Sequence, residues 1–485
     1  MVSDEHTACM FVYSPDIPCS VAEPFVASLS NSDEGVACMT DMDTLDWDVS
    51  RNNRPDYRHW RKDHVTILPA IHSSYLQYSA RNDVATKLQD HGFLSFADFN
   101  FLSKDGLYLY DAALYSAGGA DLNVEKSREL TPGIWDRRDD TMLMSDSGGF
   151  QVLTGVWTPK DYYEKREQIL RWQEEISDIG IAMDVPSGCV NSRKAKSIES
   201  VDEALFWSKA NFTWQVKNRN PSKMRMLNVI QGLEIEGQNG VLRWYDEVKG
   251  YCDRRQWGER AFDGWSFGGY AARDTQAALR VISRMLQDGF LGKHSNHRWI
   301  HVLGVTSAKR VATFTLIQKA LRQILGDEDF TVSCDSSNGC FAVGTKGNYY
   351  TDGGRGIVQR KVLHAQWFQP TCGKDCRIYC TADNPDCGPC IEQRIRNMIT
   401  MFGTSTLNFH MPFEMILDLV NYDEAGRLSP LGYLAFMNIS MEMFLRYAYR
   451  SSSKIVDAKA GVVSQLVAAL KSETPESDLA KIKLA

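Results

Sequence analysis

Short apolar runs recur along the chain, and each ends in a polar or glycine-rich stretch. Eight of these runs are candidate strands, at positions 65–69, 107–110, 142–144, 179–183, 226–230, 265–267, 299–303 and 331–334. Segments of roughly 30 to 45 residues separate them, and several, such as 162–176 and 311–324, have the apolar spacing of a helix. The alternation predicts an α/β fold, a (β/α)8 TIM barrel, with an open doubly wound sheet as the alternative.

Residues that can carry chemistry follow the ends of the later strands. They are Asp146, Asp184, Gln231, the pair Gly268 and Gly269, Gly304, and Asp335. In a TIM barrel the carboxyl ends of the strands converge on one mouth, so residues far apart in the sequence can surround a single ligand. This placement favours the barrel over the open sheet.

Composition narrows the class of protein but leaves its partner open. The hydrophobic fraction of 43% and the charged fraction of 24% are those of a soluble globular protein. No apolar run has membrane-spanning length and the acidic start lacks the features of a signal peptide, so we expect a cytoplasmic protein without a membrane partner. The formal net charge of -7 does not indicate nucleic acid, although a local basic face can coexist with it.

Three carboxylates at one mouth, those of Asp146, Asp184 and Asp335, repel one another and are costly unless each has a role. Cleavage of a glycosidic bond offers such roles. One carboxylate attacks the anomeric carbon, and another group protonates the leaving base and then deprotonates its replacement. A third carboxylate can accept hydrogen bonds from the N–H and amino edge of a guanine-like base.

Other residues at the predicted mouth suit a flat ligand. Phe150 offers a stacking face, and the Gln231 amide and the backbone N–H groups beside Gly268 and Gly269 can reach an exocyclic oxygen. Glycine leaves the backbone open to such an approach. These residues predict a pocket for a nucleobase.

The stretch from Ser145 to Gln151, with the sequence SDSGGFQ, resembles the signature of the tRNA-guanine transglycosylases. The resemblance continues in the family's order through Trp172-Gln173, Ser177-Asp178-Ile179, Asp184, Val229-Ile230-Gln231-Gly232, Phe267-Gly268-Gly269, Leu303-Gly304-Val305, Asp335 and Lys346-Gly347. It covers roughly positions 65 to 415. The heptapeptide is fairly specific alone, and the ordered set is strongly so.

The resemblance implies a TIM barrel with a zinc-bearing insertion and an exchange of guanine in nucleic acid for a 7-deazaguanine, through a covalent glycosyl-enzyme intermediate. Asp335 matches the family's nucleophile and Asp146 its acid/base residue. The matching base pocket consists of Ser147, Phe150, Asp184, Gln231, Gly268 and Gly269.

Five of the 12 cysteines crowd into positions 372–390, which favours a metal over disulfides in a chain without a secretion signal. Cys387 and Cys390 form a zinc-type knuckle, and His410 matches the family's histidine ligand. We favour Cys380 as the fourth ligand, with Cys376 as the alternative. Four protein ligands make the zinc structural. An iron–sulfur cluster is disfavoured because the last gap in the spacing of Cys372, Cys376 and Cys380 is one residue too long.

The expected divisions are an irregular N-terminal extension over 1–60, a barrel domain over 61–365, a zinc-binding subdomain over 366–415, and C-terminal helices and a tail over 416–485. Glycine-rich punctuation predicts a β-hairpin at about 340–365. Helices are expected at 391–402, 412–421 and 430–449. The tail from position 472 is expected to be frayed.

The polymer substrate is predicted from departures from the family pattern. The chain departs from the family pattern around its nucleophile, which is flanked by Cys334 and Ser336-Ser337-Asn338, at its pocket glycines and at its metal ligands. Met183-Asp184-Val185-Pro186 resembles archaeal-type and DNA-type relatives, which favours a small base such as 7-cyano-7-deazaguanine. We therefore expect the DNA-modifying DpdA branch, found in phages and in bacterial DNA-modification clusters; a phage protein would act in the host cytoplasm.

Two basic and aromatic runs, at 57–62 and 346–361, have the mixture that can hold phosphates and stack a displaced base. For the first run, ordinary surface packing is an equal alternative. Two other functions stay open: a tRNA-guanine transglycosylase of queuosine or archaeosine type, and a non-catalytic nucleic-acid-binding paralogue or partner subunit. Retention of all three aspartates argues against the last. The sequence does not decide whether a helper protein that separates the DNA strands is a partner.

Overall fold

The computed structural model of the chain describes residues 54–93, 95–195, 198–292, 295–305, 307–352, 357–361, 405–407 and 429–484. Most of the expected N-terminal extension, up to position 53, lies outside these residues. The expected zinc-binding subdomain also lies outside them, apart from residues 405–407.

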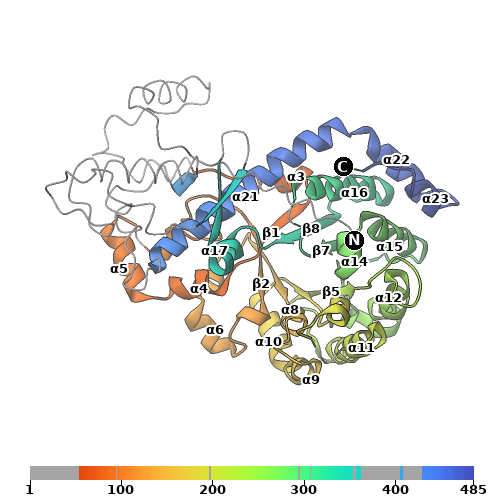
Figure 1. Ribbon diagram of the computed structural model, residues 1–485, viewed down its shortest axis with the longest axis horizontal. Helices are drawn as coiled ribbons and strands as arrows, with labels where there is room; N and C mark the ends of the chain where they lie inside the picture. The colour runs from red at the N-terminus through yellow and green to blue at the C-terminus, as the bar shows by residue number, and fades with distance from the viewer. Residues whose placement is uncertain are drawn as a thin grey trace. The chain divides into compact units, whose positions relative to one another are not determined.

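Eight parallel strands form the central sheet (Figure 1). They are β1 (Thr66–Pro69), β2 (Ala112–Ser116), β3 (Met142–Asp146), β4 (Ile179–Ile181), β5 (Arg225–Ile230), β6 (Gly264–Phe267), β7 (Trp299–Val302) and β8 (Thr331–Ser336). Neighbours pair in the order β1-β8-β7-β6-β5-β4-β3-β2. The two end strands meet through a parallel bridge between Ala70 and Leu114, and the Ile71 N–H donates to the Leu114 carbonyl at 2.8 Å. The sheet is thus a nearly closed barrel, and the TIM-barrel prediction is confirmed over the open sheet.

Helices follow every strand. They are α4 (Ser73–Ser79), α5 (Asn82–Asp90) and η3 (Phe96–Asp98) after β1; η4 (Ala117–Gly119), α6 (Val124–Leu130) and α7 (Pro132–Trp135) after β2; α8 (Gly149–Leu153), α9 (Pro159–Glu164) and α10 (Arg166–Ile176) after β3; and η5 (Ser187–Asn191) and α11 (Val201–Asn218) after β4. Then come α12 (Val241–Val248), η6 (Lys249–Cys252), α13 (Arg254–Trp257) and η7 (Gly258–Arg260) after β5; α14 (Gly269–Arg273) and α15 (Thr275–Gln287) after β6; α16 (Ala308–Leu325) after β7; and α17 (Cys340–Lys346) after β8. A short helix, α3 (Trp60–Asp63), precedes β1.

The long outer helices begin where the sequence supplies a cap. The hydroxyls of Ser200 and Ser307 accept backbone N–H groups at the starts of α11 and α16, and the Asp274 carboxylate does so for α15. Each helix then buries an apolar face against the barrel. The helix predicted at 162–176 is divided at Lys165 into α9 and α10.

One predicted strand is wrong. Residues 107–110 are buried, but Leu109 forms a parallel bridge with Asp56 and takes no part in the barrel. The barrel strand lies a few residues later, in β2. Apolar residues predict burial, and burial alone does not distinguish a barrel strand from a segment that packs beside it.

Beyond β8, the described strands β9 and β10 and helix α21 pack on the outside of the barrel. Strands β9 (Asn348–Asp352) and β10 (Ile357–Lys361) pair antiparallel, as the predicted hairpin requires. The long helix α21 (Pro430–Ala458) covers them through contacts such as Tyr349 on Phe436, with ring centroids 4.7 Å apart.

The C-terminal tail is ordered, so the expectation of fraying is wrong. Helices α22 (Gly461–Leu470) and α23 (Pro475–Leu479) continue from α21 and lie against α16 and α15 (Figure 1). Leu479 is fully buried, and its carbonyl accepts a hydrogen bond from the Gln276 amide at 3.2 Å. A tail of polar composition is held here by a few apolar anchors.

Candidate active site

Asp146 ends β3 and points into the barrel mouth from beside Ser116, its partner in register on β2. The Ser116 hydroxyl donates to Asp146 Oδ2 at 2.8 Å, and the Gly148 N–H reaches the same oxygen at 3.3 Å. Burial raises the pKa of Asp146, the Ser116 hydrogen bond lowers it, and the nearby charge of Asp335 raises it. The carboxyl group therefore holds its proton to a higher pH than an ordinary aspartate, as a general acid requires.

Asp184 and Gln231 form a buried pair beyond the ends of β4 and β5. The Gln231 Nε2 group donates to Asp184 Oδ2 at 2.7 Å. Gln231 is 3% exposed and Asp184 is 4% exposed. Burial raises the pKa of Asp184 to about 7, against the lowering effect of the Gln231 hydrogen bond. The carboxyl group thus changes charge near neutral pH.

The segment that carries Asp184 is irregular, and helix α11 holds it in place. The Gln215 side chain accepts from the Met183 N–H at 2.8 Å, and the Ser208 hydroxyl accepts from the Val185 N–H at 2.8 Å. These polar side chains satisfy backbone groups that have no partner in the sheet. Asp184 therefore has a fixed place although it lies outside β4.

Gly268 and Gly269 enclose the Gln231 side chain. A Cβ atom on Gly268 would lie 2.3 Å from Gln231 Nε2, and one on Gly269 would lie 2.5 Å from Gln231 Oε1. Gly269 also has a φ of +51°, in the left-handed region. The glycine pair is therefore required for the amide to reach its position, in addition to the open backbone that the sequence predicted.

Asp335 lies in β8 with 15% of its side chain exposed. Its Oδ1 accepts from the Gly304 N–H at 2.7 Å and lies 3.4 Å from His301 Nε2. Among the described residues, no donor bonds Oδ2. One carboxylate oxygen is thus held by the protein and the other is free to meet a ligand.

The three aspartates share one site. The charge of Asp146 raises the pKa of Asp184, and the charge of Asp335 raises that of Asp146. Gly149 packs close to the Asp184 carbonyl, where an added Cβ would lie 3.1 Å away, so the SDSGGFQ loop contacts the Asp184 segment directly. Asp146, Asp184, Gln231, Gly268, Gly269 and Asp335 therefore gather at the carboxyl ends of the strands.

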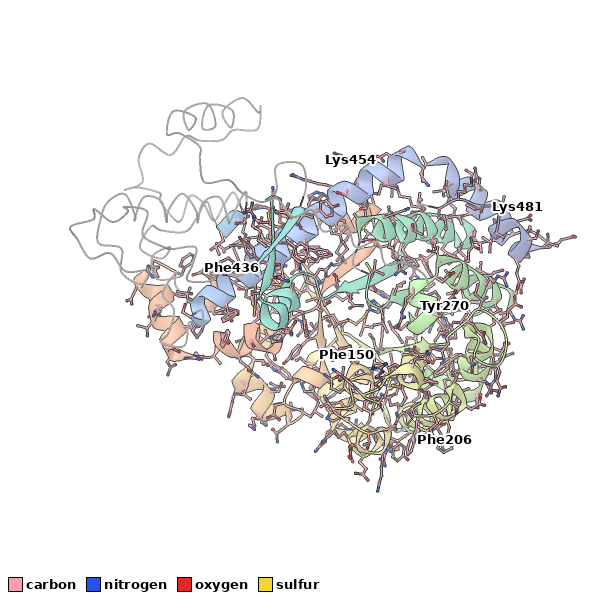
Figure 2. The ribbon with its side chains drawn as sticks, in the orientation of Figure 1. Phe150, Phe206, Tyr270, Phe436, Lys454 and Lys481 are labelled. Carbon is pink, nitrogen blue, oxygen red and sulfur yellow. The ribbon has the colours of Figure 1, made fainter. Side chains whose placement is uncertain are left out.

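Ser147 and Phe150 have different surroundings. The Ser147 hydroxyl is fully buried, accepts from the Tyr162 hydroxyl at 2.7 Å and lies 3.3 Å from the Ala182 carbonyl. Its side chain joins the loop to α9 and to the Asp184 segment. Phe150 lies on α8 and is 63% exposed (Figure 2). The Phe150 ring is thus free to cover a ligand.

The first basic and aromatic run is occupied by intramolecular contacts. The Tyr57 hydroxyl donates to Glu442 at 2.7 Å, and its ring stacks on Trp60 with centroids 5.0 Å apart. Arg58 pairs with Asp56 and Asp140. These contacts match the packing alternative more closely than a nucleic-acid surface.

The predicted metal ligands Cys380, Cys387, Cys390 and His410 lie outside the described residues. Within the described ranges, no group of three or more His, Cys, Asp or Glu side chains is arranged to hold a metal ion. In that same part of the chain, no helix has the length and apolar character needed to cross a membrane.

Two contributors to the site were not predicted from the sequence. Ser116 was missed because the second strand was placed at 107–110, so its end was sought too early. His301 was missed because it lies inside β7, whereas the search followed strand ends. The two-residue period of a strand places His301 on the same face of β7 as Trp299, but only the pairing with β8 shows that Ser333 and Asp335 lie beside it.

No family model and no curated protein matches this chain in comparisons with known proteins. The case for a function therefore depends on the residues and geometry of the site.

Proposed function

We propose that the protein is a transglycosylase that exchanges guanine in nucleic acid for a 7-deazaguanine. The observation that carries this proposal is the gathering of three aspartates in different environments around one barrel mouth, one of them bonded to a buried amide. Two carboxylates suffice to cleave and re-form a glycosidic bond, and the Asp184–Gln231 pair suits the polar edge of a purine.

The proposed reaction begins with attack of the Asp335 carboxylate on the anomeric carbon. A C–O bond to Asp335 forms as the bond to guanine breaks, and Asp146 supplies the proton that the departing base takes. The incoming 7-deazaguanine then gives its ring N–H proton to Asp146 and attacks the same carbon, which releases Asp335. Atoms and charge balance, and the sugar keeps its configuration after two displacements.

Base recognition falls to Asp184 and Gln231 in this proposal. An ionised Asp184 accepts from the ring N–H and amino groups of guanine, and carboxylate acceptors give stronger hydrogen bonds than neutral ones. One N–H of the Gln231 amide donates to Asp184, and the second N–H can donate to an exocyclic oxygen of the base. In this proposal Phe150, whose side chain is largely exposed, stacks on the base.

We further propose DNA as the polymer and 7-cyano-7-deazaguanine or a similar base as the incoming group. This choice is supported by the departures of the sequence around Asp335 and by the Met183-Asp184-Val185-Pro186 segment. A bound zinc in the cysteine-rich segment would stabilise the chain and take no part in the chemistry.

The test is incorporation of labelled guanine, and then of labelled 7-cyano-7-deazaguanine, into duplex DNA, single-stranded DNA and tRNA. We expect label in DNA and its loss in Asp335→Ala. Asp329→Asn is the matched control, because Asp329 lies just before β8 with its side chain 89% exposed. Label in tRNA alone would overturn the choice of DNA, and label in none would favour a nucleic-acid-binding subunit.

A further inference from the structure

A fully buried histidine lies beside Asp335 inside the barrel. His301 projects inward from β7, opposite Ser333 of β8 in register. Its Nδ1 lies 2.8 Å from Ser333 Oγ, and its Nε2 lies 3.4 Å from Asp335 Oδ1. Within the described residues, Nε2 makes no hydrogen bond. A ring nitrogen in this position needs Asp335 as its partner, because an unpaired buried polar group is costly.

The surroundings of Ser333 fix the proton on the histidine ring. The Trp299 Nε1–H, which can only donate, bonds Ser333 Oγ at 2.8 Å. That contact occupies one lone pair, and the described structure offers the serine proton no acceptor except His301 Nδ1. The hydroxyl therefore donates to Nδ1, which leaves the ring proton on Nε2, facing Asp335.

We infer that His301 is a positioning residue for Asp335, an inference that rests on the proposed function. The Gly304 N–H donates to Oδ1 and His301 Nε2 lies 3.4 Å from the same oxygen, so Oδ2 is left as the attacking oxygen. A separation of 3.4 Å is long for a hydrogen bond, and such contacts in ligand-free sites often tighten when substrate binds. The same N–H stabilises the carboxylate when it is released in the second step.

Two variants separate positioning from structure. His301→Leu removes the donor, and we expect the single-turnover rate of covalent adduct formation to fall by about 100-fold, with guanine affinity unchanged. His301→Gln places an amide N–H near the Nε2 position and should recover the rate to within about tenfold of the natural chain. Thermal melting of each variant checks folding. Equal rates in His301→Leu and the natural chain would overturn the inference while leaving the proposed function intact.

A second measurement does not depend on activity. Nitrogen-15 NMR of histidine-labelled protein, with His301 assigned from the His301→Gln spectrum, reports which ring nitrogen carries the proton. We expect the Nε2–H form in the natural chain, a shift of the Nε2 signal in Asp335→Ala, and appearance of the Nδ1–H form in Ser333→Ala. An Nδ1–H ring in the natural chain would overturn the inference, whether or not exchange is observed.

Discussion

The Gln231 amide donates a 2.7 Å hydrogen bond to the Asp184 carboxylate, and both side chains are buried at the barrel mouth. A buried carboxylate with a single neutral donor is poorly stabilised in its charged form, which is why burial raises its pKa to about 7. A base that offers two N–H donors would supply the further hydrogen bonds that stabilise the charged form of Asp184. Under the proposed function, the pair would bind such a ligand at the expense of the stability of the ligand-free protein.

We predict that guanine affinity rises between about pH 6 and pH 8, because Asp184 ionises with a pKa of about 7 and only its charged form accepts two hydrogen bonds. Asp184→Asn should lose about 10- to 100-fold in affinity at the upper end and show a flat profile. Calorimetric titration with guanine measures both. A flat profile in the natural chain would contradict the role given to Asp184.

The same group predicts an opposite trend in stability. The folded pKa is raised above the unfolded value of about 4, so the folded state binds the proton more tightly and the free energy of unfolding falls as pH rises from about 4 to about 7. Asp184→Asn removes this loss. Its melting temperature relative to the natural chain should rise between pH 5 and pH 8, and a constant difference would contradict the shift.

Gly268→Ala should weaken base binding and the fold together. The new Cβ would meet the Gln231 amide at 2.3 Å, so the amide must move away from Asp184. We expect a loss of about 1 to 3 kcal/mol in stability from overpacking, measured by denaturant unfolding. Gly461→Ala is the control, since an added Cβ at Gly461 meets nothing within 4 Å. Equal effects of the two substitutions would show that the glycine pair does not shape the site.

Much of the site could be predicted because barrel topology places every strand's carboxyl end at one mouth. An approximately correct strand assignment was enough to predict that Asp146, Gln231 and Asp335 lie at the mouth. Ser116 was not predicted as a site residue. Its strand begins with two alanines, and the more apolar run at 107–110 was assigned as the strand instead.

Contacts between distant segments could not be predicted from local pattern. The basic and aromatic residues at 57–62 resembled a nucleic-acid surface, yet Tyr57 bonds Glu442, which lies far along the chain on α21. His301 has the same difficulty, because only the barrel register brings Ser333 and Asp335 to its two ring nitrogens.

The sequence prediction of zinc can be tested by elemental analysis and chelation. We expect one zinc per chain, its loss in Cys387→Ser, and its retention in Cys372→Ser, a spare cysteine of the same segment. Comparison of Cys380→Ser with Cys376→Ser identifies the fourth ligand. Purified protein without zinc would refute the predicted site.

The Ser116 hydroxyl donates a 2.8 Å hydrogen bond to Asp146, and its removal should change the pH dependence of exchange in a defined direction. Burial already raises the pKa of Asp146, and the Ser116 hydroxyl opposes that effect. Ser116→Ala should therefore raise the pKa further, so Asp146 stays protonated to a higher pH. Because the proposed first step needs Asp146 as an acid, the alkaline limb of kcat/KM should move to higher pH.

Ser116→Thr keeps the hydroxyl and should leave that limb in place, which separates the hydrogen bond from any change in packing. Single-turnover rates across the alkaline range provide the comparison. If the limb moves to lower pH in Ser116→Ala, Asp146 does not act as the acid of the first step. If it moves equally in both variants, the hydroxyl is not its cause, and the pKa of Asp146 is governed by burial, by the charge of Asp335 and by the backbone N–H groups of Gly148 and Ser147.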